Sequence, residues 1–152
     1  MAMKRFKYRL ESYLKFQRFE RDRALGEKKR SEEILQGYLD QEQVLLERIK
    51  QAYLDQTYIS GNKRDLLLGD SALFLRRLAI EHENLQQEIH LAARDLERKQ
   101  DKLIAMQKQV RSIERHRDLE KEKYRKQTLK REQKQVDELN QTRAGGKDAE
   151  SL

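Results

Sequence analysis

The chain contains no cysteine and no proline, and aromatic residues make up only 7% of its 152 residues. The absence of cysteine excludes disulfides, thiolate catalysis and cysteine metal ligands. The absence of proline leaves nothing to interrupt the hydrogen bonds of a long helix. With 36% apolar and 40% charged residues, the chain has too little apolar surface for the compact core of a domain this long. One long, narrow interface between helices needs less apolar surface than a compact core does, so an all-α fold is expected.

The strongest pattern is a stripe of apolar residues in the second half of the chain, spaced alternately by three and four residues. Ten of its twelve positions are apolar, and the positions are Leu75, Leu78, His82, Leu85, Ile89, Ala92, Leu96, Lys99, Leu103, Met106, Val110 and Ile113. This is the a/d stripe of a heptad repeat, along which one helix packs on another. A patchier stripe with the same spacing occupies Leu10, Leu14, Gln17, Arg21, Ala24, Lys28, Ser31, Leu35, Tyr38, Glu42, Leu45, Ile49 and Ala52. We call these two stripes the seams. We expect the packing of the seam from Leu10 to Ala52 to be weakest between Gln17 and Ser31, where large apolar groups are nearly absent.

The only cluster of helix breakers separates the two seams. Ser60-Gly61-Asn62 and Gly69-Asp70-Ser71 predict a connection over about 59–71, between a helix over about 6–58 and a second helix over about 72–143. Two helices joined by a short connection pack antiparallel. The sequence therefore predicts an elongated, antiparallel two-helix coiled coil that forms one domain over 1–143, followed by a disordered tail over 144–152.

Two registers bring the seams together. If the numbers of paired residues add to 127, Leu85 meets Glu42 and Lys99 meets Lys28. If they add to 134, Leu85 meets Ile49 and Lys99 meets Leu35. The second register avoids a pair of facing lysines and is therefore favoured.

Positive charge is concentrated near both ends of the chain. Residues 1–30 carry eleven lysines and arginines against four acidic residues, and residues 111–134 carry ten against five. An antiparallel hairpin brings these segments to the same end. A solvated face, a surface for nucleic-acid phosphates and a surface for an acidic or polar protein socket all remain open as interpretations.

No pattern of residues in the sequence predicts a catalytic site. Gly145-Gly146-Lys147 has neither a strand nor a helix motif around it, so it does not predict a phosphate-binding loop. His82, His90 and His116 are too scattered for a metal site, and His82 is expected to be a tolerated seam residue. No apolar run reaches the roughly 18 to 20 residues of a membrane span. We expect a soluble, cytoplasmic protein that is not an enzyme and that binds no cofactor or metal.

The two ends of the chain carry distinctive motifs. The amino end reads FKYRLESYL, and the carboxyl end carries Leu119-Glu120-Lys121, Tyr124, Arg125, Glu132-Gln133-Lys134, Asp137-Glu138-Leu139 and Arg143. In these motifs and in its overall layout the chain resembles the FliJ family of bacterial flagellar export proteins. Gly26, Gly37 and Gly69 are not features that match the family.

The resemblance implies a fold, partners and a location. FliJ proteins are antiparallel two-helix coiled coils that resemble the gamma-subunit stalk of rotary ATPases. They insert the end that bears both termini into the ring of the flagellar export ATPase, FliI, and promote ring assembly and activity. They also contact the export gate protein FlhA and are linked to export chaperones. This chain would then be a cytoplasmic protein, peripheral at the inner-membrane base of the flagellum.

The residues expected to bind these partners lie at opposite ends of the hairpin. The ATPase would contact Arg9, Arg117 and Arg125 of the basic end. It would also contact Phe6 and Tyr13, because a narrow hairpin cannot bury all the aromatic residues near its amino end. The export gate would contact Tyr53, Phe74 and Leu78 near the connection, although local packing explains this apolar group as well. Other functions remain open: a generic structural coiled coil or homodimer, a stalk of the YscO type from injectisomes, and a basic nucleic-acid-binding helix.

Overall fold

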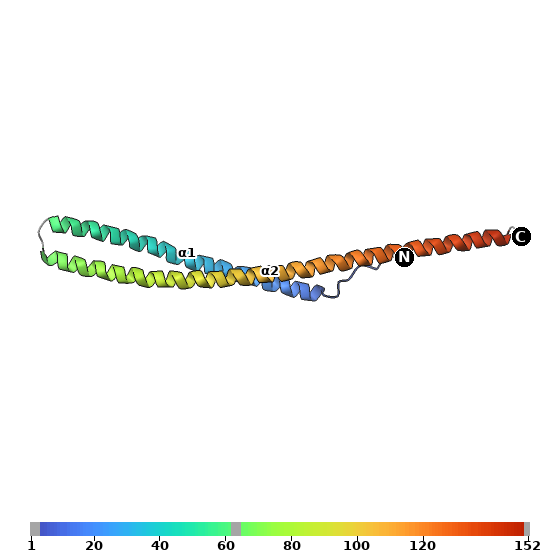
Figure 1. Ribbon diagram of the computed structural model, residues 1–152, viewed down its shortest axis with the longest axis horizontal. Coiled ribbons are helices and arrows are strands. Elements are labelled where there is room, and N and C mark those ends of the chain that lie inside the picture. Colours follow the sequence, from blue (N-terminus) through green and yellow to red (C-terminus); the bar gives the residue numbers. More distant parts are fainter. Residues whose placement is uncertain (1–3, 62–64, 151–152) are drawn as a thin grey trace. The chain divides into compact units, whose positions relative to one another are not determined.

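The computed structural model describes residues 4–61 and 65–150, with side chains described except at 59–68 and 147–150. The described chain contains two helices, α1 (Glu11–Gly61) and α2 (Asp65–Glu150). They pack against each other as an antiparallel hairpin (Figure 1). The predicted all-α, two-helix fold is confirmed.

The seams predicted from the sequence form the contact between the helices. All twelve seam residues of α2 and all twelve of α1 are buried or half-buried, whereas Leu10, which precedes α1, is 38% exposed. Leu14, Leu78 and Val110 are the largest fully buried side chains. The three-four spacing therefore identified the buried faces nearly residue by residue, because a helix repeats its faces every 3.6 residues.

The helix ends differ from those expected. Helix α1 begins at Glu11 rather than near Phe6, and the amide of Glu11 donates to the carbonyl of Tyr8 at 3.2 Å. The acidic side chain in this first turn suits the positive end of the helix dipole. Residues 4–10 are therefore free of helical geometry and can follow a path of their own.

The predicted connection is also too long. Helix α2 begins at Asp65 rather than at about 72, so that Gly69-Asp70-Ser71 lies inside the helix. Leucines, which favour helices, precede this glycine, whose cost of about 1 kcal/mol relative to alanine does not end the helix by itself. For the same reason α2 continues through Gly145-Gly146 to Glu150, where a disordered tail was expected. Asn62 lies outside the described residues.

The chain divides into two compact units. The terminal unit consists of Met1–Phe19 with Gln107–Leu152, and the distal unit is Glu20–Met106. The division in α1 falls within the stretch predicted to be weakest, where Gln17 is the seam residue in place of a large apolar one. Each unit contains a stretch of both helices and is described by itself below.

Polar pairs in the distal unit correct the predicted register. Ser31 Oγ donates to Asp95 Oδ2 at 3.0 Å, and Glu42 Oε2 lies 3.5 Å from His82 Nε2. The residue numbers of these pairs add to about 125, which is close to the register of 127. The favoured register of 134 is therefore wrong.

The two lysines that counted against the observed register are each neutralised on their own helix. Lys28 Nζ lies 3.2 Å from Glu32, and Lys99 Nζ lies 3.1 Å from Asp95. Both acids are four residues from their lysine, the spacing at which helical side chains meet. The repulsion between the facing lysines is thus offset by an ion pair within each helix.

Asp95 links both helices and makes stability depend on pH. Hydrogen bonds from Lys99 and then from Ser31 lower the pKa of Asp95 below its ordinary value of 3.8. A lowered pKa contributes stability that is fully present above the ordinary value and is lost as pH falls through the lowered one. We expect Asp95→Asn to lower the urea midpoint at about pH 7 and to have little effect at about pH 2. Asp101→Asn, at an exposed acid of the same helix, is the control; an equal loss at both pH values would contradict this origin.

Candidate functional site

The two end motifs meet in the terminal unit. The rings of Phe6 and Tyr124 have centroids 5.5 Å apart, which is a contact distance for aromatic pairs. Tyr8 Oη and His116 Nδ1 form a hydrogen bond of 2.6 Å, and the Tyr124 hydroxyl donates to the carbonyl of Lys4. The non-helical segment 4–10 is therefore held on α2 by residues more than 100 positions away in the sequence.

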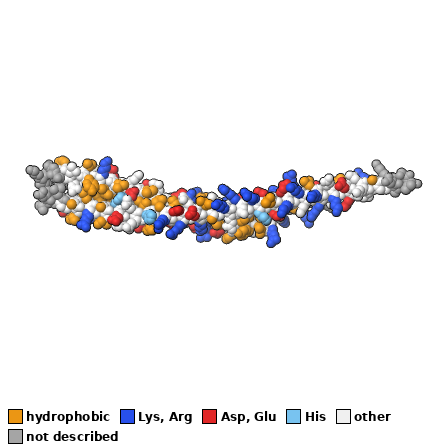
Figure 2. Space-filling view, in the orientation of Figure 1, with side chains coloured by type: hydrophobic (Ala, Val, Ile, Leu, Met, Phe, Trp, Pro, Cys, Tyr) orange, Lys and Arg blue, Asp and Glu red, His pale blue; other side chains and the backbone are white. Residues whose placement is uncertain are grey.

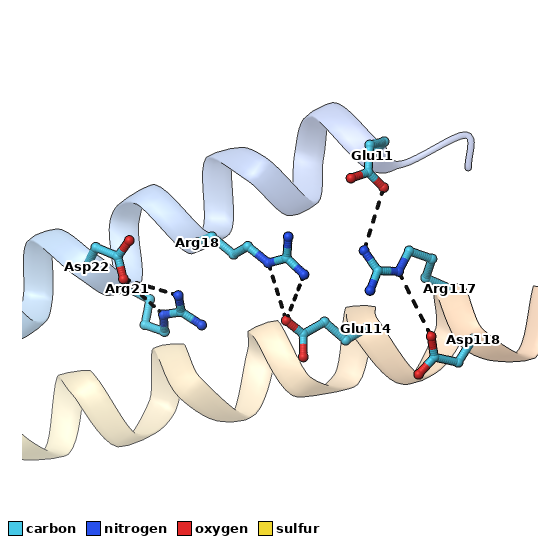
Figure 3. Close-up of polar contacts among 7 residues, drawn as sticks. All are labelled: Glu11, Arg18, Arg21, Asp22, Glu114, Arg117 and Asp118. Carbon is cyan, nitrogen blue, oxygen red and sulfur yellow. Dashed lines mark hydrogen bonds and ion pairs between the residues drawn. The ribbon is translucent and has the colours of Figure 1, made fainter. Parts of the chain in front are cut away.

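Ion pairs join α1 to α2 in the same unit (Figure 3). Arg18 Nε and Nη2 both donate to Glu114 Oε1, at 3.3 and 3.0 Å. Arg117 lies between two acids, with Nη1 3.9 Å from Glu11 Oε2 and Nε 4.0 Å from Asp118 Oδ1. These side chains are partly exposed, so each pair contributes at most about 1 kcal/mol to stability. Their main effect is to commit Arg18 and Arg117 to contacts within the unit.

All five residues expected to bind an ATPase lie in the terminal unit, in different environments. Arg9 and Arg125 are exposed, whereas Phe6 is half-buried. Tyr13 is 43% exposed, and its hydroxyl accepts a hydrogen bond from Gln109 Nε2 at 3.1 Å. Arg117 is half-buried by the pairs described above. The exposed arginines are thus the members of this group best placed to meet a partner.

A groove on α2 adds residues that the sequence analysis missed. It is lined by Phe6, Tyr124, Thr128 and Leu129, together with the charged residues Asp118, Lys121, Glu122 and Arg125. Leu129 is 54% exposed, so an apolar wall edged by charges of both signs is open to solvent. The spacing of the sequence could have indicated this part of α2. Arg117, Glu120 and Tyr124 continue the three-four spacing beyond Ile113, and all three are half-buried.

The terminal unit also exposes aromatic side chains on α1. Phe16 is 56% exposed and Phe19 is 64% exposed. The prediction that a narrow hairpin cannot bury all its amino-terminal aromatics is confirmed. These rings, the groove and the exposed arginines make the terminal unit the candidate functional site.

The residues expected to bind an export gate separate into two kinds. Tyr53 is 59% exposed and Phe74 is 45% exposed, and hydrophobic side chains gather near this end of the distal unit in Figure 2. Leu78 is only 2% exposed and packs in a core cluster with Leu45 and Ala52. Its assignment to a binding surface was wrong, because a seam residue points at the partner helix. The exposed residues that remain are Tyr53, one position after Ala52, and Phe74, one position before Leu75, which lie on opposite sides of the seam.

No family model, no curated protein and no solved structure matches this chain. The described helices include none that is long and apolar enough to cross a membrane. Within the same residues, no group of three or more histidines, aspartates and glutamates is placed to hold a metal ion.

Proposed function

We propose that this protein is the non-catalytic stalk and adaptor of a bacterial flagellar export apparatus. In this proposal the terminal unit inserts into the ring of the export ATPase, FliI, and promotes ring assembly and ATP hydrolysis. The distal unit contacts the export gate protein FlhA through Tyr53 and Phe74. The observation that carries the proposal is the packing of the two end motifs on each other, with Phe6 on Tyr124.

This packing matters because the resemblance to the FliJ family depends on both motifs. In the sequence they are separate and either could arise by convergence among coiled coils. Residues 4–10 are held on α2 by Tyr8 and Tyr124, so the motifs form one surface rather than two. A single composite surface is what a protein needs in order to present both ends of its chain to one partner.

The charge of the terminal unit favours a protein socket over nucleic acid. Arg9 and Arg125 are exposed cations, but acids are interleaved with the cations along α2, among them Glu114 and Asp118, which pair with arginines. Phosphate binding gains from a continuous basic surface, which such pairing interrupts. Complementary charge on a protein steers association without requiring that continuity.

A pull-down with the purified chain distinguishes the candidate functions. We expect immobilised protein to retain the export ATPase, with retention unaffected by nuclease and reduced by salt. Salt acts because the screening length falls from about 8 Å at physiological ionic strength to about 3 Å at 1 M. Loss of retention after nuclease treatment would indicate a nucleic-acid-binding helix instead. Absence of retention at every salt concentration would leave a structural coiled coil, and preference for an injectisome ATPase would indicate the related stalk of that system.

A further inference from the structure

One lateral face of the distal unit is almost without charge. In the heptads defined by the seams, this face consists of the e positions, which lie on the same side of the seam in both helices of an antiparallel pair. We call it the neutral face, and its residues are Leu25, Leu39, Leu46 and Tyr53 of α1 with Ala79, Gln86, Ala93 and Gln100 of α2. The charged residue among these positions is Glu32, which pairs with Lys28 at 3.2 Å.

The opposite side of the same seam is charged. Glu27 Oε2 lies 3.7 Å from Lys102 Nζ across the helices. Farther along, Arg48, Glu81 and Glu88 line a groove on this side. The two sides of one hairpin therefore differ sharply in polarity, although both flank the same core.

The neutral face exposes large apolar side chains. Leu25 and Leu39 are each 36% exposed, Leu46 is 44% exposed and Tyr53 is 59% exposed. A two-helix coiled coil needs apolar residues only at a and d, whereas apolar residues at a, d and e are typical of helices that pack on more than one neighbour. Helix α1 thus carries the wider stripe of a bundle helix, and the distal unit covers only part of it.

We propose that a second copy of this chain covers the neutral face, so that two distal units form an antiparallel four-helix bundle. The face is self-complementary in shape. Its α1 side is a ridge of large residues centred on Leu46, and the small residue Ala79 of α2 lies at the same height, because their numbers add to 125 as in the observed register. A two-fold axis parallel to the helices sets Leu46 of each copy over Ala79 of the other, as an isologous interface requires.

The size and the charge of the face suit this occupant. From Leu25 to Tyr53 the face is about 42 Å long at 1.5 Å per residue, and two helices side by side are about 20 Å wide. The product, about 800 Å², is the area that each partner buries in a specific interface of standard size. The e positions of two copies meet almost without like-charge repulsion, and the outer positions beside them on α2 carry both signs, at Arg76, Glu83 and Glu97.

The test is the mass of the purified chain over a range of concentrations, measured by analytical ultracentrifugation. We expect the wild type to shift from monomer to dimer as concentration rises. Leu46→Glu places a charge in the centre of the face and should weaken dimerisation at least tenfold. Val44→Glu is the matched control, because Val44 is 63% exposed, lies on the charged side of α1 and should dimerise as the wild type does.

A second measurement remains informative if Leu46→Glu lowers helix content. Because the chain has no cysteine, Leu46→Cys and Ala79→Cys, whose numbers add to 125 as in the observed register, can be made as separate proteins and mixed under mild oxidation. We expect a disulfide to link one variant to the other, since Leu46 of one copy lies over Ala79 of its partner. Crosslinking of each variant only with itself would overturn this arrangement.

A wild type that stays monomeric at all concentrations would overturn the proposal and leave the face to a helix of another protein. Dimers equally sensitive to Leu46→Glu and Val44→Glu would also overturn it. Neither result bears on the proposed contact with the ATPase, because Val44, Leu46 and Ala79 lie outside the terminal unit and the measurement uses no partner. In the dimer the second copy covers Tyr53 and leaves Phe74, on the opposite side of the seam, open to the gate protein.

Discussion

Reversal of charge at Arg9 and Arg125 is expected to lower stimulation of the export ATPase at least about tenfold at a fixed, subsaturating concentration of this protein. Both side chains are exposed in the terminal unit. A tenfold loss corresponds to about 1.4 kcal/mol. Repulsion between the two introduced glutamates and an acidic socket readily supplies this amount. The measurement is ATP hydrolysis by the purified ATPase in a titration with Arg9→Glu/Arg125→Glu and with the wild type.

The control carries the same change of net charge elsewhere. Lys50→Glu/Arg94→Glu alters two exposed residues of the distal unit and should stimulate as the wild type does. Exposed substitutions change the free energy of unfolding by only about 0.5 kcal/mol each, so neither variant should melt early. Equal stimulation by both double variants and the wild type would rule out the stalk function.

Arg117 is tested apart from the exposed arginines. It pairs with Glu11 and Asp118, so its reversal removes contacts inside the terminal unit as well as charge on its surface. A loss of activity in Arg117→Glu alone would not distinguish binding from packing. The pair of exposed arginines therefore gives the clearer result.

The second large effect is expected at Leu78 and should contrast with that at Phe74. Leu78→Ala removes a side chain that is 2% exposed from the core cluster of the distal unit. Large-to-small substitutions at such sites cost about 2 to 5 kcal/mol, from lost burial and from the cavity that remains. Urea denaturation followed by circular dichroism should show this loss.

Phe74→Ala should behave in the opposite way. Its side chain is 45% exposed, so truncation should change the free energy of unfolding by about 1 kcal/mol or less. Under the proposed function it should nevertheless weaken binding of the purified gate protein FlhA, while stimulation of the ATPase remains. If Phe74→Ala destabilises the chain as much as Leu78→Ala does, Phe74 is a packing residue and the gate surface must lie elsewhere.

Much of the fold could be predicted from the sequence because one physical rule controls it. Leu103 and Val110 are buried as the seam requires, and even the polar seam residues Gln17 and Ser31 are buried. Their positions follow from helical periodicity, which depends only on the backbone. The candidate site was predicted in part, since all five terminal residues fall in one unit, but His116 and Leu129 were missed.

The errors have a common physical origin. Leu78 was assigned to a surface because it lies near Phe74 in the sequence, although the seam already required its burial. The register was misjudged because Lys28 and Lys99 were treated as free charges. Each has an acid on its own helix, so the expected repulsion does not decide which residues face each other.

The sequence by itself determined that the chain is helical and which face of each helix is buried, because both follow from local propensity and from a repeat of 3.6 residues. Only the tertiary structure decided how far the helices extend, which residues meet across the seam and how residues 4–10 pack on α2. These depend on side chains distant in sequence, such as Ser31 with Asp95 and Phe6 with Tyr124. Heptads repeat every seven residues, so several registers bury nearly the same apolar area. The particular polar and aromatic pairs then select one of them.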